Sequence, residues 1–229
     1  MTKPLYIVIG AYGSGKSEFS LHLAKTLNTT EHDVVLADMD VVNPYFRSRD
    51  VQEEYSALGI EVIAPEGQFK HADLPMLSPR IKGAVENYAK TVILDVGGDP
   101  AGCRTLGRFV EAVTLRGHEM LFVVNTFRPF TSSVEEVLRM KEQLEFASKL
   151  KITEFVCNNN LMEHTTPEVI QEGIEILEEC SRLTGLPFRH YLVLDAYADI
   201  VPDGLCGKER LVMAYTLKKP WEGLALKGI

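Results

Sequence analysis

Residues 10–17, Gly-Ala-Tyr-Gly-Ser-Gly-Lys-Ser, match the phosphate-binding pattern G-x-x-x-x-G-K-[ST] at every fixed position. An apolar run, residues 5–9, precedes them, and a helix-like stretch, residues 18–27, follows. The pattern binds phosphate only as a turn from a strand into a helix, and this context argues against a glycine-rich turn with an accidental lysine. The motif therefore requires a strand-loop-helix unit at the start of the chain and predicts that the chain binds a nucleoside triphosphate.

The chemistry of the motif follows from its glycines and its last two residues. Glycine lets the backbone wrap a phosphate without a Cβ clash, and the amide groups at the helix N-terminus point at the bound anion. Lys16 would neutralise the outer phosphates, and the hydroxyl of Ser17 would bind Mg²⁺. The predicted phosphate-binding residues are Gly10, Tyr12, Gly13, Ser14, Gly15, Lys16 and Ser17.

The length of 229 residues allows one large α/β domain with a substantial core, and no break in composition divides residues 1–229. The formal net charge of −8 argues against nucleic acid and anionic lipid as partners. The four cysteines are far apart, which disfavours a zinc or iron–sulfur site and fits thiols in a reducing compartment. No apolar run reaches membrane-spanning length, and no secretory segment is recognised. We therefore expect a single cytoplasmic domain with no nucleic-acid or membrane partner.

Short β-branched runs alternate with longer helix-like stretches along the whole chain. Strands are predicted at residues 5–9, 34–37, 61–64, 91–95, 120–125, 154–158 and 191–194. Helices are predicted at residues 17–27, 49–58, 75–88, 104–116, 132–149, 167–184 and 208–217. Apolar strands separated by helices indicate a mostly parallel sheet that is covered on both faces. The predicted fold is a three-layer α/β/α sandwich of the P-loop NTPase type, with its ligand at the carboxyl ends of the strands.

Two carboxylates, Asp38 and Asp40, follow the second predicted strand. Carboxylates at this place are costly to bury unless they face Mg²⁺ or water, and the phosphate-binding loop already places the magnesium nearby. The alternative is an acidic turn that opens a helix. The same loop continues to Arg47 and Arg49, which could reach a phosphate or a neighbouring subunit. We expect this loop to face the magnesium site, with Asp40 as a metal ligand.

Asp95 ends the fourth predicted strand and is followed closely by Gly97 and Gly98. An acid that ends an apolar strand in a P-loop protein is the expected outer-sphere ligand of magnesium. The two glycines would let the backbone approach the γ-phosphate and move after hydrolysis. Arg104 and Arg108 could neutralise negative charge across a dimer interface, although such residues more often form surface salt bridges.

Asparagines follow two further predicted strands, at Asn125 and at Asn158 and its neighbours. An asparagine amide offers both a donor and an acceptor, which reading the edge of a purine requires. We expect Asn158 or Asn159 to contact the base, although asparagine is also common in turns. No N-K-x-D guanine motif follows a predicted strand, which favours adenine. A polar stretch at residues 67–75, which includes His71, is a candidate partner or substrate surface.

The phosphate-binding loop, the Asp38-x-Asp40 loop and the Asp95-x-Gly97-Gly98 segment together resemble the MinD/ParA-like branch of P-loop ATPases, the CobQ/CobB/MinD/ParA members of the SIMIBI class. That branch includes nitrogenase iron protein, arsenite-pump ATPases, carbon monoxide dehydrogenase maturation ATPases and cobyrinic acid amide synthase-type domains. The Asp-x-Asp-x-x-Asn-Pro-x-Phe-Arg and Gly-Gly-Asp-Pro sequences look like an uncharacterised group usually labelled nucleotide-binding protein. The resemblance extends over residues 5–217 and suggests a homodimer.

The resemblance also implies the roles of individual residues. Lys16 and Ser17 would hold the phosphates and Mg²⁺ of bound ATP, and Asp40 would orient the attacking water. Asp40 and Lys16 are thus the expected catalytic residues. Asp95 would support the metal, and Asn158 or its neighbour would hold adenine.

One position departs from the pattern of these relatives. Many of them carry a second lysine directly after the first glycine of the phosphate-binding loop, and that lysine crosses to the phosphates of a partner subunit. This chain has Ala11 there. If ATP is hydrolysed between two subunits, another cation must replace the lysine, and the candidates are Arg47, Arg49, Arg104 and Arg108. The paired cysteines of the metal-cluster relatives are also absent from the sequence.

Three functions are compatible with these patterns. The leading one is a slow, magnesium-dependent ATPase that acts as a conformational switch read by a protein partner, in metalloenzyme maturation, cofactor delivery or scaffolding. The second is a small-molecule kinase or ATP-dependent ligase, although the sequence shows no dedicated lid or acceptor-binding motif. The third is a nucleotide sensor with negligible turnover, which Ala11 favours.

Overall fold

The computed structural model describes residues 2–30, 33–40, 52–64 and 78–217. Within these residues one sheet is formed, and every pair of neighbouring strands is parallel. The order across the sheet is β3-β2-β4-β1-β5-β6-β7-β8, so that β1 and β5 lie at its centre. The strands are β1 (Leu5–Ile9), β2 (Val34–Met39), β3 (Glu61–Ile63), β4 (Thr91–Val96), β5 (Glu119–Val124), β6 (Glu154–Cys157), β7 (Phe188–Leu194) and β8 (Glu209–Met213).

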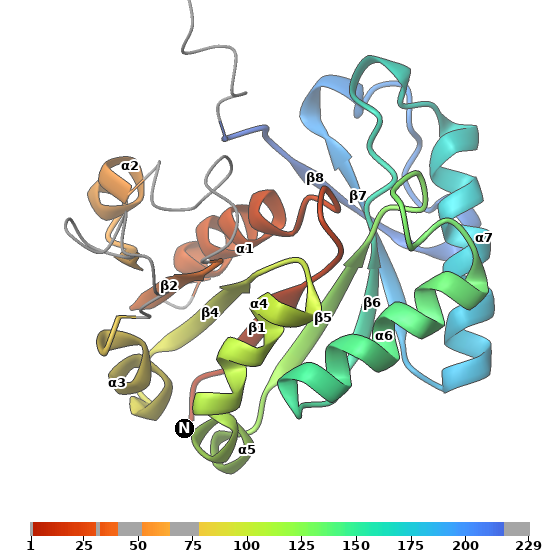
Figure 1. The fold of residues 1–229 in the computed structure, drawn as a ribbon. Helices are drawn as coiled ribbons and strands as arrows, with labels where there is room; N and C mark the ends of the chain where they lie inside the picture. Colours follow the sequence, from red (N-terminus) through yellow and green to blue (C-terminus); the bar gives the residue numbers. More distant parts are fainter. Residues whose placement is uncertain (1, 31–32, 41–51, 65–77, 218–229) are drawn as a thin grey trace, which may run out of the picture.

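Helices cover both faces of this sheet (Figure 1), which confirms the predicted α/β/α arrangement. The α-helices are α1 (Lys16–Thr30), α2 (Gln52–Ala57), α3 (Arg80–Glu86), α4 (Pro100–Cys103), α5 (Val110–Arg116), α6 (Val134–Ser148) and α7 (Pro167–Thr184). Short 3-10 helices are η3 (Arg104–Arg108), η4 (Met162–His164), η5 (Asp195–Tyr197) and η6 (Leu205–Gly207).

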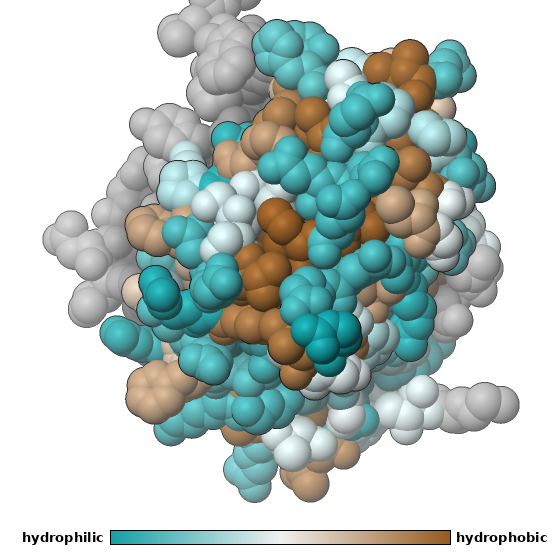
Figure 2. Space-filling model, turned by 90° about the vertical axis from the view of Figure 1, so that its right-hand side faces the viewer, coloured by the Kyte–Doolittle hydropathy of each residue, from teal (hydrophilic) through white to brown (hydrophobic). Residues whose placement is uncertain are grey.

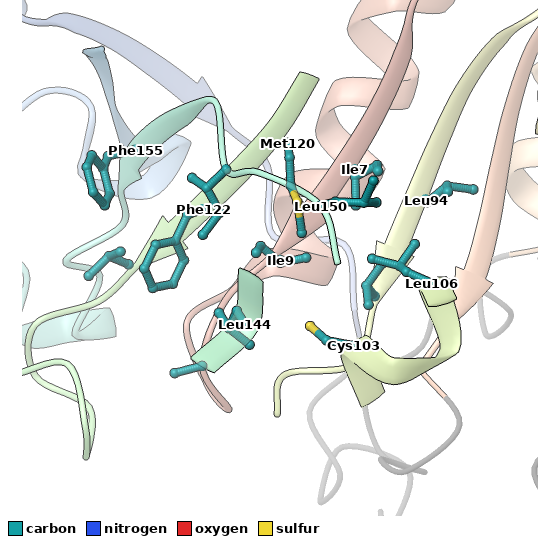
Figure 3. Packing of buried hydrophobic residues seen from close by; sticks show 14 of the residues in the cluster. Ile7, Ile9, Leu94, Cys103, Leu106, Met120, Phe122, Leu144, Leu150 and Phe155 are labelled. Atoms are coloured by element: carbon teal, nitrogen blue, oxygen red, sulfur yellow. The ribbon is translucent and has the colours of Figure 1, made fainter. Parts of the chain in front are cut away.

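The core is divided into two apolar clusters by the sheet itself. Successive side chains of a strand point to opposite faces, so Ile7 and Ile9 of β1 belong to one cluster and Val8 to the other. The larger cluster lies between the sheet and α3 to α7. Figure 3 shows Met120 and Phe122 of β5 packed there together with Leu144 of α6. Because the central strands are buried on both faces, they are mainly apolar, and this pattern made them predictable.

Two predicted helices differ from the structure. The pattern predicts a helix at 208–217, but Glu209–Met213 form the edge strand β8, which pairs parallel with β7. An edge strand is only partly covered, so it lacks the continuous apolar run that marks an inner strand. The helix expected at 104–116 is divided into the 3-10 helix η3 and the α-helix α5. It is preceded by the short helix α4, which Asp99 caps by accepting a hydrogen bond from the amide of Gly102 at 2.5 Å.

Helix α7 shows how a helix separates the core from solvent. Its buried residues recur at helical spacing and include Ile170, Ile174 and Leu177, while Glu172 and Glu175 are exposed. Figure 2 shows the side of the molecule that carries α7, where hydrophilic residues surround a central band of hydrophobic surface.

None of the described helices is both long and apolar enough to cross a membrane.

Arg116, at the end of α5, joins segments that are far apart in the sequence. The residue is buried, with 9% of its surface exposed. Both terminal nitrogens of its side chain donate hydrogen bonds to backbone carbonyls. Nη1 reaches the carbonyls of Ala84 at 3.2 Å, Val85 at 2.9 Å and Asn87 at 3.2 Å, and Nη2 reaches those of Lys3 at 3.0 Å, Pro4 at 3.2 Å and Lys90. The guanidinium therefore ties the N-terminal segment to the end of α3 and the start of β4.

Candidate functional site

The loop between β1 and α1 has the predicted strand-loop-helix form. Gly13 and Gly15 have φ angles of 75° and 85°, a backbone region that residues with a side chain rarely adopt. The amide of Ser14 donates to the carbonyl of Ala11 at 3.1 Å, which closes a turn before α1 begins at Lys16. The N-terminus of a 15-residue helix thus lies at the carboxyl end of a central strand, where backbone amides attract anions.

Close backbone contacts explain why glycines surround this loop. A Cβ atom at Gly10 would lie 2.4 Å from Ser14 Oγ and from the carbonyl of Val123. A Cβ atom at Gly98, in the loop after β4, would lie 3.0 Å from the carbonyl of Gly10 and from the amide of Tyr12. The loop after β4 therefore rests directly on the backbone of the phosphate-binding loop.

Lys16 and Asp40 meet inside the site. The ammonium of Lys16 lies 3.3 Å from Asp40 Oδ2, and both residues are buried. The amide of Asp40 donates to Asp38 Oδ1 at 3.0 Å, so the two aspartates after β2 form one compact turn. The structure thus brings together two residues that are 24 positions apart and that the sequence predicts to share a site.

Asp95 lies at the end of β4, beside the first turn of α1. Its Oδ1 accepts a hydrogen bond from Ser20 Oγ at 3.1 Å. Burial raises the pKa of the Asp95 carboxyl to about 6, while Lys16 and the hydroxyl of Ser17 act in the opposite direction. A carboxyl that is buried beside the Ser17 hydroxyl would ionise more readily next to a divalent cation.

The asparagines after β6 have different surroundings. Asn158 Nδ2 donates to the carbonyl of Ser14 at 2.7 Å, and its Oδ1 is buried without a hydrogen-bond partner among the described residues. Asn159 is fully buried, and its Nδ2 donates to Thr126 Oγ1 at 2.8 Å and to the carbonyl of Val169 at 2.9 Å. Both amide hydrogens of Asn159 are therefore used to hold neighbouring loops, whereas Asn158 faces the phosphate-binding loop.

A cavity of about 560 Å³ opens beside these residues, a size suited to a small-molecule ligand. One part of its wall comes from the phosphate-binding loop and the start of α1, and includes Tyr12, Gly13, Gly15, Lys16 and Ser17. Another part is mainly apolar and includes Leu161, Met162, Met213, Tyr215 and Leu217. A polar, cationic wall next to an apolar wall matches a ligand with a charged chain and a flat ring.

Glu18 anchors the apolar wall to the phosphate-binding loop. It follows Ser17 directly, and its carboxylate accepts hydrogen bonds from the amides of Thr216 and Leu217. The two contacts with Leu217 measure 3.0 and 3.1 Å. Burial raises the pKa of Glu18, and the two backbone amides oppose that rise. The segment after β8 is thus fastened to the first turn of α1, an arrangement that the predicted helix at 208–217 did not anticipate.

Arg128, in the loop after β5, also reaches this cavity. Its Nε donates to the carbonyl of Gly13 at 3.1 Å. In the sequence, Arg128 lies three residues after Asn125, just beyond a predicted strand. This position could have indicated that Arg128 belongs to the site. Arg104 and Arg108 instead lie on η3, exposed and away from the cavity wall. Arg47, Arg49 and the polar stretch with His71 lie outside the described residues.

The residues present fit a nucleotide. The glycines form a cradle that a Cβ atom would fill, and the unpartnered Oδ1 of Asn158 is a buried acceptor at the edge of the cavity. For magnesium, Ser17 and Asp95 supply a hydroxyl and a carboxyl side by side. Mg²⁺ is usually bound in this way, by one or two protein oxygens together with phosphate oxygens.

Comparison with known proteins places this geometry in a family. Residues 5–190 match the model of the CobQ/CobB/MinD/ParA nucleotide binding domain. A search of curated proteins finds no match.

Solved structures of similar fold include the cell division protein FtsY from Thermotoga maritima, with 20% identity, a TM-score of 0.59, and coverage of 83% of this chain and 62% of that one. Chloroplast FtsY from Physcomitrella patens has 17% identity and a TM-score of 0.56, with coverage of 83% and 58%. This chain thus spans roughly three fifths of these FtsY structures, and the likeness concerns the fold. The family model, which matches most of the chain, decides the assignment: the chain belongs to the CobQ/CobB/MinD/ParA family of P-loop nucleotide-binding domains.

Proposed function

We propose that the chain is a magnesium-dependent ATPase that acts as a nucleotide-dependent switch. The observation that carries this proposal is the buried ion pair of Lys16 with Asp40, at 3.3 Å. A phosphate that binds Lys16 competes with Asp40 for the same ammonium group. Phosphate binding and release would therefore change the surroundings of Asp40 and of the loop that follows β2, which is how a switch reports its ligand.

The residues of the site would divide the chemistry among them. Asp40, once separated from Lys16, would accept a hydrogen bond from the attacking water and orient it. Ser17 and Asp95 would hold Mg²⁺, which supplies positive charge to the phosphates. Gly98 would follow the terminal phosphate, because its backbone already touches the phosphate-binding loop.

Adenine is the base that we propose for the apolar wall of the cavity. The Oδ1 of Asn158, which has no partner among the described residues, is an acceptor that suits the exocyclic amine of adenine, and no N-K-x-D guanine motif follows a predicted strand. Asn159 does not enter this proposal, because its amide hydrogens are already bound. We further propose one cytoplasmic domain that works as a homodimer with a protein partner, in metalloenzyme or cofactor maturation.

The decisive experiment measures ATP binding by calorimetry and phosphate release without any acceptor. We expect the wild-type protein to bind Mg-ATP and release phosphate slowly. Lys16→Ala should weaken binding at least tenfold, because a charge-assisted hydrogen bond contributes roughly 1.5–3 kcal/mol. Asp40→Asn should retain binding, because the side chain at position 40 no longer carries a charge that competes with the phosphate for Lys16. The same substitution should lower turnover about 100-fold or more.

Asp199→Asn is the matched control, because Asp199 is an exposed aspartate outside the cavity wall. Full turnover in Asp40→Asn would contradict the role of Asp40. Phosphate release only in the presence of a metabolite would replace the switch with a kinase or ligase. Binding with no release under any condition would leave a nucleotide sensor.

A further inference from the structure

The side chain of Arg128 lies against the phosphate-binding loop itself. Its Nε donates to the carbonyl of Gly13 at 3.1 Å, and a Cβ atom at Gly13 would lie 3.3 Å from the same nitrogen. Gly13 is one of the glycines with positive φ that shape the loop. The guanidinium is therefore held next to the backbone that would wrap the phosphates.

The charged end of Arg128 is not neutralised within the described part of the chain. Nε forms the hydrogen bond to Gly13, whereas the terminal nitrogens form no hydrogen bond or ion pair with any described residue. Among the described residues that line the cavity, the cations are Lys16 and Arg128, and Lys16 is already paired with Asp40. Arg128 thus brings an uncompensated positive charge to the cavity, next to the phosphate-binding loop.

The loop that carries Arg128 is fixed without the help of the guanidinium. Thr131 Oγ1 donates to the carbonyl of Asn125 at 2.8 Å, and the amide of Phe127 donates to Asn125 Oδ1 at 2.9 Å. The amide of Thr126 donates to Asn159 Oδ1 at 2.9 Å. Since these bonds hold the loop, a structural role does not account for the charge of Arg128.

We propose that Arg128 is a phosphate-binding residue that contacts the β- and γ-phosphates of the nucleotide from within the same chain. The loop backbone and its lysine cradle these two phosphates in P-loop proteins, and Gly13 belongs to that backbone. A planar guanidinium with free terminal N–H groups can bind phosphate oxygens through two parallel hydrogen bonds. This inference rests on the proposed binding of a nucleoside triphosphate and adds a residue to it.

The test compares Arg128→Gln and Arg128→Lys with the wild-type protein. Glutamine keeps an N–H group that can reach the carbonyl of Gly13 but removes the charge, and lysine keeps the charge but loses the planar fork. Dissociation constants for AMP, ADP, ATP and inorganic tripolyphosphate are measured by calorimetry at low and high salt. Arg182→Gln, on the exposed face of α7, is the matched control.

We expect Arg128→Gln to lower the affinity for ATP and tripolyphosphate about tenfold, the affinity for ADP less, and the affinity for AMP hardly at all. The affinity of this variant for ATP should also depend less on salt than that of the wild-type protein. Arg128→Lys should lie between Arg128→Gln and the wild-type protein. Equal ATP affinity in Arg128→Gln and the wild-type protein, or an equal loss for AMP and ATP, would overturn the proposal while leaving nucleotide binding intact. A wild-type protein that binds neither ATP nor tripolyphosphate would instead overturn the proposed function, and this inference with it.

Discussion

Gly98 has no side chain, and this allows the loop after β4 to lie directly against the phosphate-binding loop. Its backbone leaves no room for a Cβ atom, which would lie 3.0 Å from two backbone atoms of the phosphate-binding loop. Backbone cannot rotate aside as a flexible side chain can, so the added methyl group would have to displace the loop.

Gly98→Ala should therefore lower the free energy of unfolding by about 1–3 kcal/mol and weaken ATP binding in parallel. Gly107→Ala is the matched control, because a Cβ atom there meets nothing within 4 Å. Thermal unfolding and calorimetric titration with ATP would check both variants. Unchanged ATP affinity in Gly98→Ala would show that the two loops are not coupled.

The individual site residues were predictable to different degrees. Lys16 and Ser17 could be predicted, because the spacing of the motif fixes their positions on a strand-loop-helix turn. Asn158 and Asn159 could not be separated by sequence, since adjacent residues after a strand differ in direction rather than in chemistry. Arg128 follows a predicted strand by three residues, but its contact with Gly13 depends on how two loops 115 residues apart approach each other.

At the scale of elements, the contact of Glu18 with the segment after β8 joins α1 to the last strand. The carboxylate of Glu18 accepts the hydrogen bonds of the Thr216 and Leu217 amides. The fold thus relies on one buried acid to place part of the cavity wall.

Glu18→Ala should destabilise the protein by roughly 1–3 kcal/mol, since two buried amides lose their acceptor. Glu18→Gln keeps one carbonyl oxygen and should recover part of the loss. Urea unfolding measures the stability, and hydrogen exchange at residues 216–217 should accelerate in Glu18→Ala. Slow exchange at these amides in Glu18→Ala would contradict the anchoring role.

A charged network joins β6, β7 and β8. His190 Nδ1 lies 3.2 Å from Glu154 Oε1, and its Nε2 lies 3.3 Å from Glu209 Oε2. Arg189 pairs with the other oxygen of Glu154 at 2.5 Å. The hydrogen bond to Glu154 raises the pKa of His190, with the charges of Glu154 and Glu209 acting in the same direction.

This network should make stability depend on pH with a defined sign. Because the folded pKa of His190 lies above its ordinary value of 6.5, the stabilisation is complete below pH 6.5 and is lost as pH rises through the folded pKa. The difference in unfolding free energy between the wild-type protein and His190→Gln should shrink over that range. Equilibrium urea unfolding at a series of pH values measures this difference.

Elements at the centre of the sheet were easier to predict than those at its edge. The strands β1, β4 and β5 are mainly apolar because both faces are covered. β8 contains exposed and partly buried positions and one buried residue, Met213, and its segment carries charged residues that equally suit a helix. Only the pairing with β7, a tertiary contact, decides between the two structures.

At the scale of the whole molecule, the order of the strands explains why the site lies where it does. β1 is flanked by β4 and β5, so the loops after these three strands meet at one edge of the sheet. The alternation of strands and helices was sufficient to predict the layers and the parallel sheet. It was not sufficient to predict the strand order, because crossover connections of similar length permit several orders.

Arg116 is the residue on which we expect the overall stability to depend most strongly. Arg116→Met would remove six hydrogen bonds to backbone carbonyls and should cost on the order of 3 kcal/mol or more. Arg116→Lys should recover part of this loss. Arg182→Met, at an exposed arginine paired with Glu179, should cost less than about 1 kcal/mol. Equilibrium unfolding in urea measures all three, and equal losses at the two arginines would contradict this account.

The carbonyls that Arg116 binds belong to segments that are distant in the chain, residues 3–4 and residues 84–90, and that of Lys3 lies 113 residues away. The guanidinium gains its partners only after the N-terminal segment, α3 and β4 have docked, because distant segments must first be brought together. We therefore expect these bonds to be absent from the transition state of folding. Replacing Arg116 would then leave the refolding rate nearly unchanged and would appear in the unfolding rate instead. In that case the arginine does little to speed the assembly of the molecule and much to extend its lifetime.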